Sequence, residues 1–333
     1  MLLDRFDDLD RAVLHALQID GRAPFRRIGE VLGVSDQTVA RRYAALRRTR
    51  ALRVVGLSDQ IAANQVHWVV RARATPEAAG EITDALARRP DTSWIDLCSG
   101  GTEIVSAAGG TGVEPLLLEA LPRTRHVLDV RADQVLHTFY GGSGQPFTKH
   151  GPLAASQVAD LIEHLPTPIE LPPRLDANDR RLLAVLRVDG RAPVEELMAA
   201  TKMSPSSVRR RLYTLRAGGV LHLDVDVDLG LLELPVRTML WLSVNVADLD
   251  AVGRALAGHD EVAFAAATTG PANIFATVLT RDTAALYRYL TAAVAAVPGV
   301  AAVETAPVLR HVKAAVTHYP PRPAHDAAAP HRT

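Results

Sequence analysis

The chain repeats itself, and this repeat limits its possible folds more than any other feature of the sequence. The run Asp20-Gly21-Arg22-Ala23-Pro24 returns as Asp189-Gly190-Arg191-Ala192-Pro193. At the same offset, without a gap, identical residues recur: Asp7 and Asp176, Asp10-Arg11 and Asp179-Arg180, Leu14 and Leu183, Leu17 and Leu186, Ser35 and Ser204, Val39 and Val208, Arg41-Arg42 and Arg210-Arg211, Leu46-Arg47 and Leu215-Arg216, Leu52 and Leu221. With small gaps, Trp68 then matches Trp241, Gly100 matches Gly270, and Val135-Leu136 matches Val308-Leu309. Self-similarity on this scale indicates one structural unit present twice.

The composition is that of an ordinary globular chain with more than one core. Of 333 residues, 48% are apolar, which is enough to give each copy its own core. The apolar stretches are interrupted well before the ~20 residues of a membrane span, and Met1–Arg11 has no signal-peptide pattern. We therefore expect no membrane association and a cytoplasmic location. Cys98 is the only cysteine, which excludes an intrachain disulfide and a zinc site built on cysteines.

Basic residues gather at equivalent places in the two copies. The 37 basic and 37 acidic residues of the chain cancel, so a nucleic-acid surface must be local. No acidic residue occurs between Gln37 and Ser58, or between Leu197 and Leu223. The basic residues of these two stretches are Arg41, Arg42, Arg47, Arg48, Arg50 and Arg53 in the first, and Lys202, Arg209, Arg210, Arg211 and Arg216 in the second. A solvated helix face explains one such stretch, but two at equivalent positions favour a binding surface.

Each copy begins with a pattern typical of three short helices. Apolar residues at helical spacing precede Asp20-Gly21, and Pro24 stands where a second helix begins. Gly33 ends that helix and Ser35 caps a third, so the tight turn between them predicts a helix-turn-helix. The second copy repeats this order, and its alternating run over 220–228 predicts a strand or wing.

The third helix of each copy has the chemistry of a helix that enters the major groove. Short polar side chains at its N-terminus suit base edges, and the arginines that follow suit phosphates. The DNA-binding residues predicted in this way are Ser35, Gln37, Thr38, Arg41, Arg42 and Arg47 in the first copy, and Ser204, Ser206, Ser207, Arg209, Arg210, Arg211 and Arg216 in the second.

These motifs resemble the leucine-responsive/asparagine (Lrp/AsnC) family of transcriptional regulators. The resemblance rests on Leu9-Asp10-Arg11, on the Asp20-Gly21-Arg22 turn, and on the run from Met203 to Leu212. The second copy matches better, because the first has Asp36 where the family usually has Pro and lacks the glycine pair after its third helix. Both copies have Arg, at 47 and 216, where a Glu is common in the family. The resemblance implies a sequence-specific regulator that binds double-stranded DNA.

The second part of each copy predicts a small α/β domain. Residues 240–246 alternate as a strand does, and helical spacing, two short strands, a second helix and a last strand follow. This βαββαβ order is that of a ferredoxin-like fold. In the Lrp/AsnC family such a domain pairs with a second copy and binds amino acids or related molecules near a Gly-x-x-Asp turn. The effector-binding residues that the resemblance implies are Gly100, Gly101, Thr102 and Glu103, and Thr269, Gly270 and Asn273.

The two effector turns differ in charge. Glu103 can pair with an α-amino group, whereas Asn273 can only hydrogen-bond it. Pro271 also lacks an N–H that Gly101 can offer to a carboxylate. We expect amino-acid binding to depend more on Glu103 than on Asn273, and an ordinary β-turn without a ligand is the alternative.

The predicted fold class is α+β, with two copies of a winged helix-turn-helix domain followed by a ferredoxin-like sensing domain. The predicted segments are two helix-turn-helix domains over 1–60 and 174–230, two sensing domains over 61–142 and 231–320, a linker with a short helix at about 152–165 over 143–173, and a disordered tail over 321–333. The linker is long enough for the two copies to meet as a pseudo-dimer within the chain, and we also expect self-association of chains.

Two other functions remain possible from the sequence. Siroheme decarboxylases look like fused Lrp/AsnC halves, but the twelve histidines here are scattered without ligand spacing, and no catalytic constellation stands out. An effector or interaction module that has lost DNA binding is the second alternative. We expect no enzyme activity and no cofactor, and the arginines of both third helices favour DNA binding.

Overall fold

The chain forms two compact units. The computed structural model describes residues 6–49, 51–58, 66–110, 113–141, 149, 151–170, 173–315, 317 and 319. The first unit comprises Met1–Trp68 and Asp133–Pro307, and the second comprises Val69–Ala132 and Val308–Thr333. The tail over 321–333 and the predicted boundary at 60/61 lie outside the described residues. Within the described residues, none of the helices combines the length and apolarity that crossing a membrane requires.

The first helix-turn-helix belongs to the first unit and has the predicted three helices. They are α1 (Asp8–Ile19), α2 (Phe25–Leu32) and α3 (Asp36–Arg48). Asp7 caps α1 by accepting from the Asp10 N–H in a capping box, and Ser35 caps α3 by accepting from the Thr38 N–H. Gly33 ends α2 in the left-handed conformation, φ 69°, which glycine adopts without strain.

The second helix-turn-helix, also in the first unit, repeats these devices. Its helices are α8 (Ala177–Val188), α9 (Val194–Thr201) and α10 (Pro205–Ala217). Asp176 and Ser204 cap α8 and α10 as Asp7 and Ser35 cap their equivalents. At the end of α9, however, the left-handed position is held by Lys202, φ 61°.

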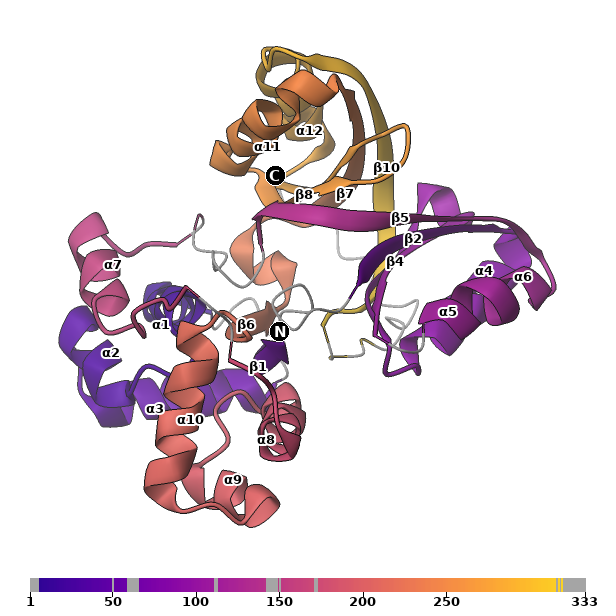
Figure 1. Cartoon of the computed structure of the whole chain (residues 1–333). Coiled ribbons are helices and arrows are strands. Elements are labelled where there is room, and N and C mark those ends of the chain that lie inside the picture. Colours follow the sequence, from indigo (N-terminus) through magenta and orange to yellow (C-terminus); the bar gives the residue numbers. More distant parts are fainter. Residues whose placement is uncertain are drawn as a thin grey trace. The chain divides into compact units, whose positions relative to one another are not determined.

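The two helix-turn-helix copies are joined by a two-stranded antiparallel sheet. Strand β1 (Leu52–Ser58) pairs with β6 (Leu221–Val227), and the two lie side by side (Figure 1). Leu52 faces Val227, and Val55 faces Asp224. The repeat offset also relates Val55 to Asp224, so an approximate twofold axis passes through this pair of residues.

The linker helix packs on the first copy rather than forming a free spacer. Helix α7 (Ala155–Ile162) buries Leu161 in the core of the first helix-turn-helix. Its Gln157 side chain donates to the Val31 carbonyl over 2.8 Å, and Arg27 of α2 donates to the Asp160 carbonyl over 3.1 Å. The first copy therefore has a layer of structure that comes from outside the repeat.

The second sensing domain completes the first unit. Its elements are β7 (Val236–Val244), α11 (Leu249–Gly258), β8 (Val262–Thr268), β9 (Ile274–Thr280), α12 (Thr283–Arg288) with a π-helical continuation over Tyr289–Val294, and β10 (Val300–Lys313). The strand order β10-β7-β9-β8 is ferredoxin-like. The C-terminal part of β5 (Val127–Tyr140) extends this sheet by pairing with β8, for example Val135 with Thr268. A strand from the first half of the chain is thus built into the sheet of the second half.

The second unit holds the first sensing domain. Its elements are β2 (His67–Ala74), α4 (Pro76–Ala87), β3 (Thr92–Cys98), β4 (Glu103–Gly109), a helical segment made of α5 (Val113–Pro115), a π-helical turn over Leu116–Ala120 and α6 (Leu121–Arg123), and the beginning of β5. The strand order β3-β4-β2-β5 is again ferredoxin-like, and residues 308–313 of β10 add to β3. Polar contacts fix this added strand, because His311 Nδ1 lies 2.7 Å from the buried Asp96 carboxylate.

Candidate nucleic-acid interface and effector turns

The predicted DNA-binding residues divide into those that face solvent and those that hold the protein together. On α3, Gln37, Arg41 and Arg48 are exposed. On α10, Ser206, Arg209 and Arg210 are exposed. The hydroxyls of Ser35 and Ser204 accept the N–H groups of Thr38 and Ser207 over 3.1 and 3.3 Å, so these two serines act as helix caps. Apart from the Ser206 hydroxyl, which lies 3.1 Å from the Ser204 hydroxyl, the exposed set is available for a nucleic acid without breaking an internal contact that the structure records.

Arg42 and Arg211 are held against the first helix of their own copy. Arg42 Nη1 lies 2.8 Å from Asp7 Oδ2 and 3.3 Å from Asp10 Oδ2. Arg211 pairs with Asp179, whose side chain is fully buried, and it donates to the Arg174 carbonyl over 2.9 Å. These ion pairs fix the third helix on the first, so both arginines position the helix whose exposed face is described above.

The two equivalent aspartates differ in their electrostatics. Burial tends to raise the pKa of Asp179, but the hydrogen bonds from Arg211 and from the Asp176 N–H outweigh it, and the pKa is lowered. Burial raises the pKa of Asp10, and its more distant Arg42 does not reverse the effect. The ion pair in the second copy is therefore the stronger one.

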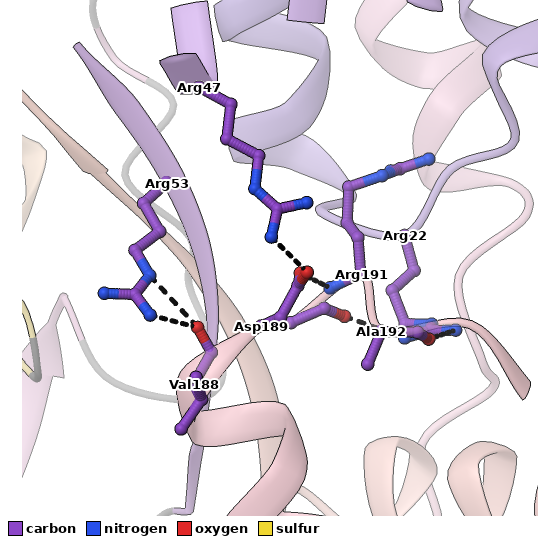
Figure 2. A network of polar contacts seen from close by, with 8 residues as sticks. Arg22, Arg47, Arg53, Val188, Asp189, Arg191 and Ala192 are labelled. Atoms are coloured by element: carbon purple, nitrogen blue, oxygen red, sulfur yellow. Dashed lines mark hydrogen bonds and ion pairs between the residues drawn. The ribbon is translucent and has the colours of Figure 1, made fainter. Parts of the chain in front are cut away.

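Arg47 and Arg216 connect the two copies. Arg47 Nη2 lies 2.6 Å from Asp189 Oδ2, and Arg216 Nη2 lies 2.7 Å from Asp20 Oδ1. Each aspartate ends the first helix of the other copy, so the two contacts are reciprocal. Figure 2 shows Arg47 directed at Asp189 and Arg53 directed at the Val188 carbonyl, which accepts two hydrogen bonds of 3.0 and 2.6 Å.

A second reciprocal contact comes from the duplicated turn itself. Arg22 donates to the carbonyls of Gly190 and Ala192 over 2.8 and 3.0 Å. Arg191 donates to those of Gly21 and Ala23 over 2.7 and 3.0 Å. Arg191 also lies over the rings of Phe25 and Tyr43, at 4.3 and 5.4 Å from their centroids. We call this set of contacts, made by Asp20, Arg22, Arg47, Asp189, Arg191 and Arg216, the junction.

The junction was not predicted from the sequence. The Asp-Gly-Arg turn indicated only the end of a helix, and the arginines that face solvent could not be told from those that pair with aspartates. One signal was available in the sequence: the five-residue turn is identical in both copies. A turn that only faces solvent does not require the same arginine in each copy, so the identity indicated a structural contact.

The first effector turn is closed by an ion pair. Ser99, Gly100 and Gly101 have φ values of 52°, 70° and 91°, which bend the chain sharply between β3 and β4. Glu103 is 4% exposed. Its carboxylate accepts from Arg71 of β2 and, over 2.7 Å, from the Ser99 hydroxyl. Glu103 therefore already has a cationic partner within its own domain.

The second effector turn is closed by neutral hydrogen bonds. The Asn273 side chain accepts from the Val244 N–H over 2.9 Å and donates to its carbonyl over 2.8 Å. The Thr269 hydroxyl accepts a hydrogen bond from the Gln134 N–H over 2.8 Å. The Thr269 N–H donates to the Gln134 carbonyl over 2.9 Å. The turn is thus flanked by β5, a strand from the first half of the chain.

Comparison with known families matches both helix-turn-helix copies and the second sensing domain. The AsnC-type helix-turn-helix domain matches residues 6–47 and again residues 175–216. The Lrp/AsnC ligand binding domain matches residues 238–317. The two helix-turn-helix matches and the ligand-binding-domain match are to families of transcriptional regulators. The chain belongs to the Lrp/AsnC family of transcriptional regulators, in a form that carries the helix-turn-helix twice.

Two curated relatives each match less than half of the chain in sequence. The HTH-type transcriptional regulator FL11 of Pyrococcus abyssi is 26% identical over 137 residues, which are 41% of this chain and 90% of that protein. The regulatory protein AsnC of Haemophilus influenzae is 29% identical over 146 residues, 42% of this chain and 97% of that protein. Among solved structures, the siroheme decarboxylase NirDL is similar over 92% of this chain and 94% of its own, with a TM-score of 0.62 and 13% identity. At that identity the likeness shows a shared fold alone.

Proposed function

We propose that this regulator binds double-stranded DNA through α3 and α10 and responds to a small-molecule effector, an amino acid or a related metabolite. One observation carries the proposal: the junction holds the C-terminal ends of both third helices, and their polar N-terminal ends remain exposed. A helix of 13 residues extends roughly 20 Å, so each polar end lies well away from the junction. Rigid presentation of two such ends suits a duplex with two half-sites.

Within each third helix the roles follow from the contacts. Exposed Arg41, Arg48, Arg209 and Arg210 are the proposed phosphate or guanine contacts, and Gln37 and Ser206 are the proposed base-edge contacts. Thr38 and Ser207 lie on the first turn beside the caps and contribute hydroxyls. Arg42, Arg47, Arg211 and Arg216 act indirectly, because their charges are committed to aspartates.

The proposed effector sites are the two turns described above. At the first turn, residues Gly100 to Glu103 offer the Gly101 N–H for a carboxylate, while Glu103 holds Arg71. At the second, Thr269, Gly270 and Asn273 offer uncharged groups only. A zwitterion has one charge of each sign to satisfy, so the charged first turn is the better candidate. Titration calorimetry with amino acids tests this: Glu103→Gln weakens binding, and Asn273→Ala has the smaller effect. The reverse order would contradict the assignment.

DNA binding is tested with duplexes selected by the full chain from a random-sequence pool. Arg210→Ala lowers affinity for the selected duplex by about tenfold and lowers the slope of log affinity against log salt by about 1. Arg254→Ala is the matched control, because Arg254 is an exposed arginine on α11 paired only with Asp250 among the residues described. The proposal fails if no duplex is retained at low salt, or if Arg210→Ala binds as tightly as the parent at every salt concentration.

A further inference from the structure

The two third helices are related by one approximate twofold axis but present different side chains, and this combination bears on the DNA sequence that they bind. We propose that the chain recognises an inverted repeat whose two halves differ in sequence, so that it binds DNA in one orientation. The proposal rests on the DNA binding proposed above and specifies its substrate.

The first step is that the two copies are related by an approximate rotation within one compact unit. The β1–β6 register places equivalent residues Val55 and Asp224 opposite each other. The same rotation relates the contact between Arg47 and Asp189 to the contact between Arg216 and Asp20, because each joins equivalent residues of opposite copies. A twofold arrangement of recognition helices matches an inverted repeat, with half-site centres about 10 base pairs, or a multiple, apart.

The second step is that the junction is built to resist rearrangement. Arg22 and Arg191 are mostly buried, and each donates two hydrogen bonds to backbone carbonyls of the other copy. Burial lowers the pKa of both guanidinium groups, as removal from water does for a cation. Breaking these contacts leaves buried polar groups without partners, which is costly. The orientation of α3 relative to α10 is therefore fixed before DNA is bound.

The exposed faces of the two helices have diverged, while the Ser35 and Ser204 caps and the junction have not. Nor have the ion pairs of Arg42 with Asp10 and of Arg211 with Asp179, which we call the latches. Position by position along the two helices, the first copy has one residue where the second has another: Asp36 and Pro205, Gln37 and Ser206, Thr38 and Ser207, Ala40 and Arg209, Ala44 and Tyr213. Of the exposed arginines, Arg41 alone has an exposed identical equivalent, Arg210.

These differences change which bases each helix can read. A glutamine can bind the N6 and N7 edge of adenine with two hydrogen bonds, whereas a serine accepts or donates one bond to several bases. Arg209 adds a cation beside Arg210 that Ala40 cannot supply, and the exposed Tyr213 adds an aromatic ring in place of Ala44. Asp36 places a carboxylate at the start of α3, where it repels phosphate. The half bound by α10 is the one held more tightly.

The test compares three duplexes built from the sequence that the full chain selects from a random pool. One carries the selected left and right halves, and the other two carry either half twice as a symmetric inverted repeat. We expect the mixed duplex to bind about tenfold or more tightly than the duplex with two α3 halves, because each mismatched base pair lowers affinity substantially. Equal binding of all three duplexes would overturn the proposal and leave DNA binding intact, whereas failure to select any duplex would overturn the proposed function itself.

A chimera provides the second measurement. The triple variant Gln37→Ser, Ala40→Arg and Ala44→Tyr gives α3 three exposed residues of α10, and these positions lie outside the core. The chimera is expected to prefer the duplex with two α10 halves, while its thermal midpoint stays near that of the parent. A folded chimera that keeps the parent's preference for the mixed duplex would overturn the assignment of specificity to these residues.

Discussion

The two helix-turn-helix copies share a scaffold but differ in how strongly it is held. In the first copy, Arg42 divides its charge between Asp7 and Asp10, and the linker helix α7 covers α1 and α2. In the second, Arg211 binds Asp179 with two nitrogens, and the buried cluster is smaller. The first copy is thus stabilised by packing from outside the repeat, and the second by a stronger internal ion pair.

The comparison separates residues that hold the two helix-turn-helix copies together from residues that we propose contact DNA. Where the copies agree, as in Asp20, Arg22 and Arg47 with their equivalents, the side chains hold the junction. Where they disagree, as in Gln37 and Ser206, the side chains face solvent. Because both copies lie in one chain, a solvent-facing residue can change in one copy alone. An assembly of two identical chains does not permit this.

The largest expected difference between the copies follows loss of the buried aspartates. Asp179→Ala removes the partner of Arg211 and half of a capping box, and is expected to lower the free energy of unfolding by about 2–3 kcal/mol. Asp10→Ala also removes half of a capping box, but it removes the weaker ion pair and leaves Arg42 paired with Asp7, so the expected loss is about 1 kcal/mol. Urea denaturation followed by circular dichroism measures both. Equal losses would show that the two latches are equivalent after all.

A smaller difference is expected at the junction. Arg191→Met removes two hydrogen bonds and the contacts with the Phe25 and Tyr43 rings. Arg22→Met removes two hydrogen bonds and, among the described residues, no ring contact. Because a partly buried cation over an aromatic ring contributes about 0.5–2 kcal/mol, Arg191→Met is expected to be the more destabilising by that amount. The midpoint of urea denaturation of the two variants, measured side by side, checks the order. If Arg22→Met is as destabilising, the aromatic rings contribute nothing.

The local parts of this architecture could be predicted from sequence, and the long-range parts could not. The apolar spacing, the Ser35 and Ser204 caps and the duplicated turn depend on neighbouring residues, and they predicted the three-helix pattern in both copies. Which arginines face solvent depends on partners far along the chain: Arg42 meets Asp10 across 32 residues, and Arg216 meets Asp20 across 196. A basic stretch has the same appearance whether its charges face solvent or aspartates.

The effector turns show the same limit. The residue types at Glu103 and Asn273 predicted unequal chemistry, but not that each side chain is bound within its own domain. Arg71 lies 32 residues before Glu103, and Val244 lies 29 before Asn273. Both partners are on the first strand of the domain, which a turn motif does not include.

Acid titration is expected to affect the two latches in opposite directions. The folded-state pKa of Asp179 is lowered, so its stabilising effect is present above the unfolded pKa and is lost as the pH falls through the folded value. The folded-state pKa of Asp10 is raised, so its contribution improves as the pH falls and is lost as the pH rises through the folded value. Between about pH 6 and about pH 3, the stability of the parent relative to Asp179→Asn decreases, whereas relative to Asp10→Asn it increases. Parallel pH profiles for the two variants would contradict these shifts.

The smallest expected effect concerns the turn between the second and third helices. Gly33 and Lys202 occupy equivalent left-handed positions, and the left-handed conformation costs an ordinary residue roughly 1–2 kcal/mol. Replacing Lys202 with glycine removes this cost, but part of the gain is lost because glycine gives up more backbone entropy on folding than lysine does. Lys202→Gly is therefore expected to raise the free energy of unfolding by about 0.5–1 kcal/mol. Gly33→Lys is expected to lower it by a similar amount, since a Cβ there meets no atom within 4 Å and the cost is conformational alone.

Lys202→Asn is the matched control, because asparagine also tolerates this conformation but lacks the charge. A thermal midpoint that rises for Lys202→Gly and Lys202→Asn alike identifies relief of backbone strain, whereas no rise in either variant would show that the lysine is held at this position without cost.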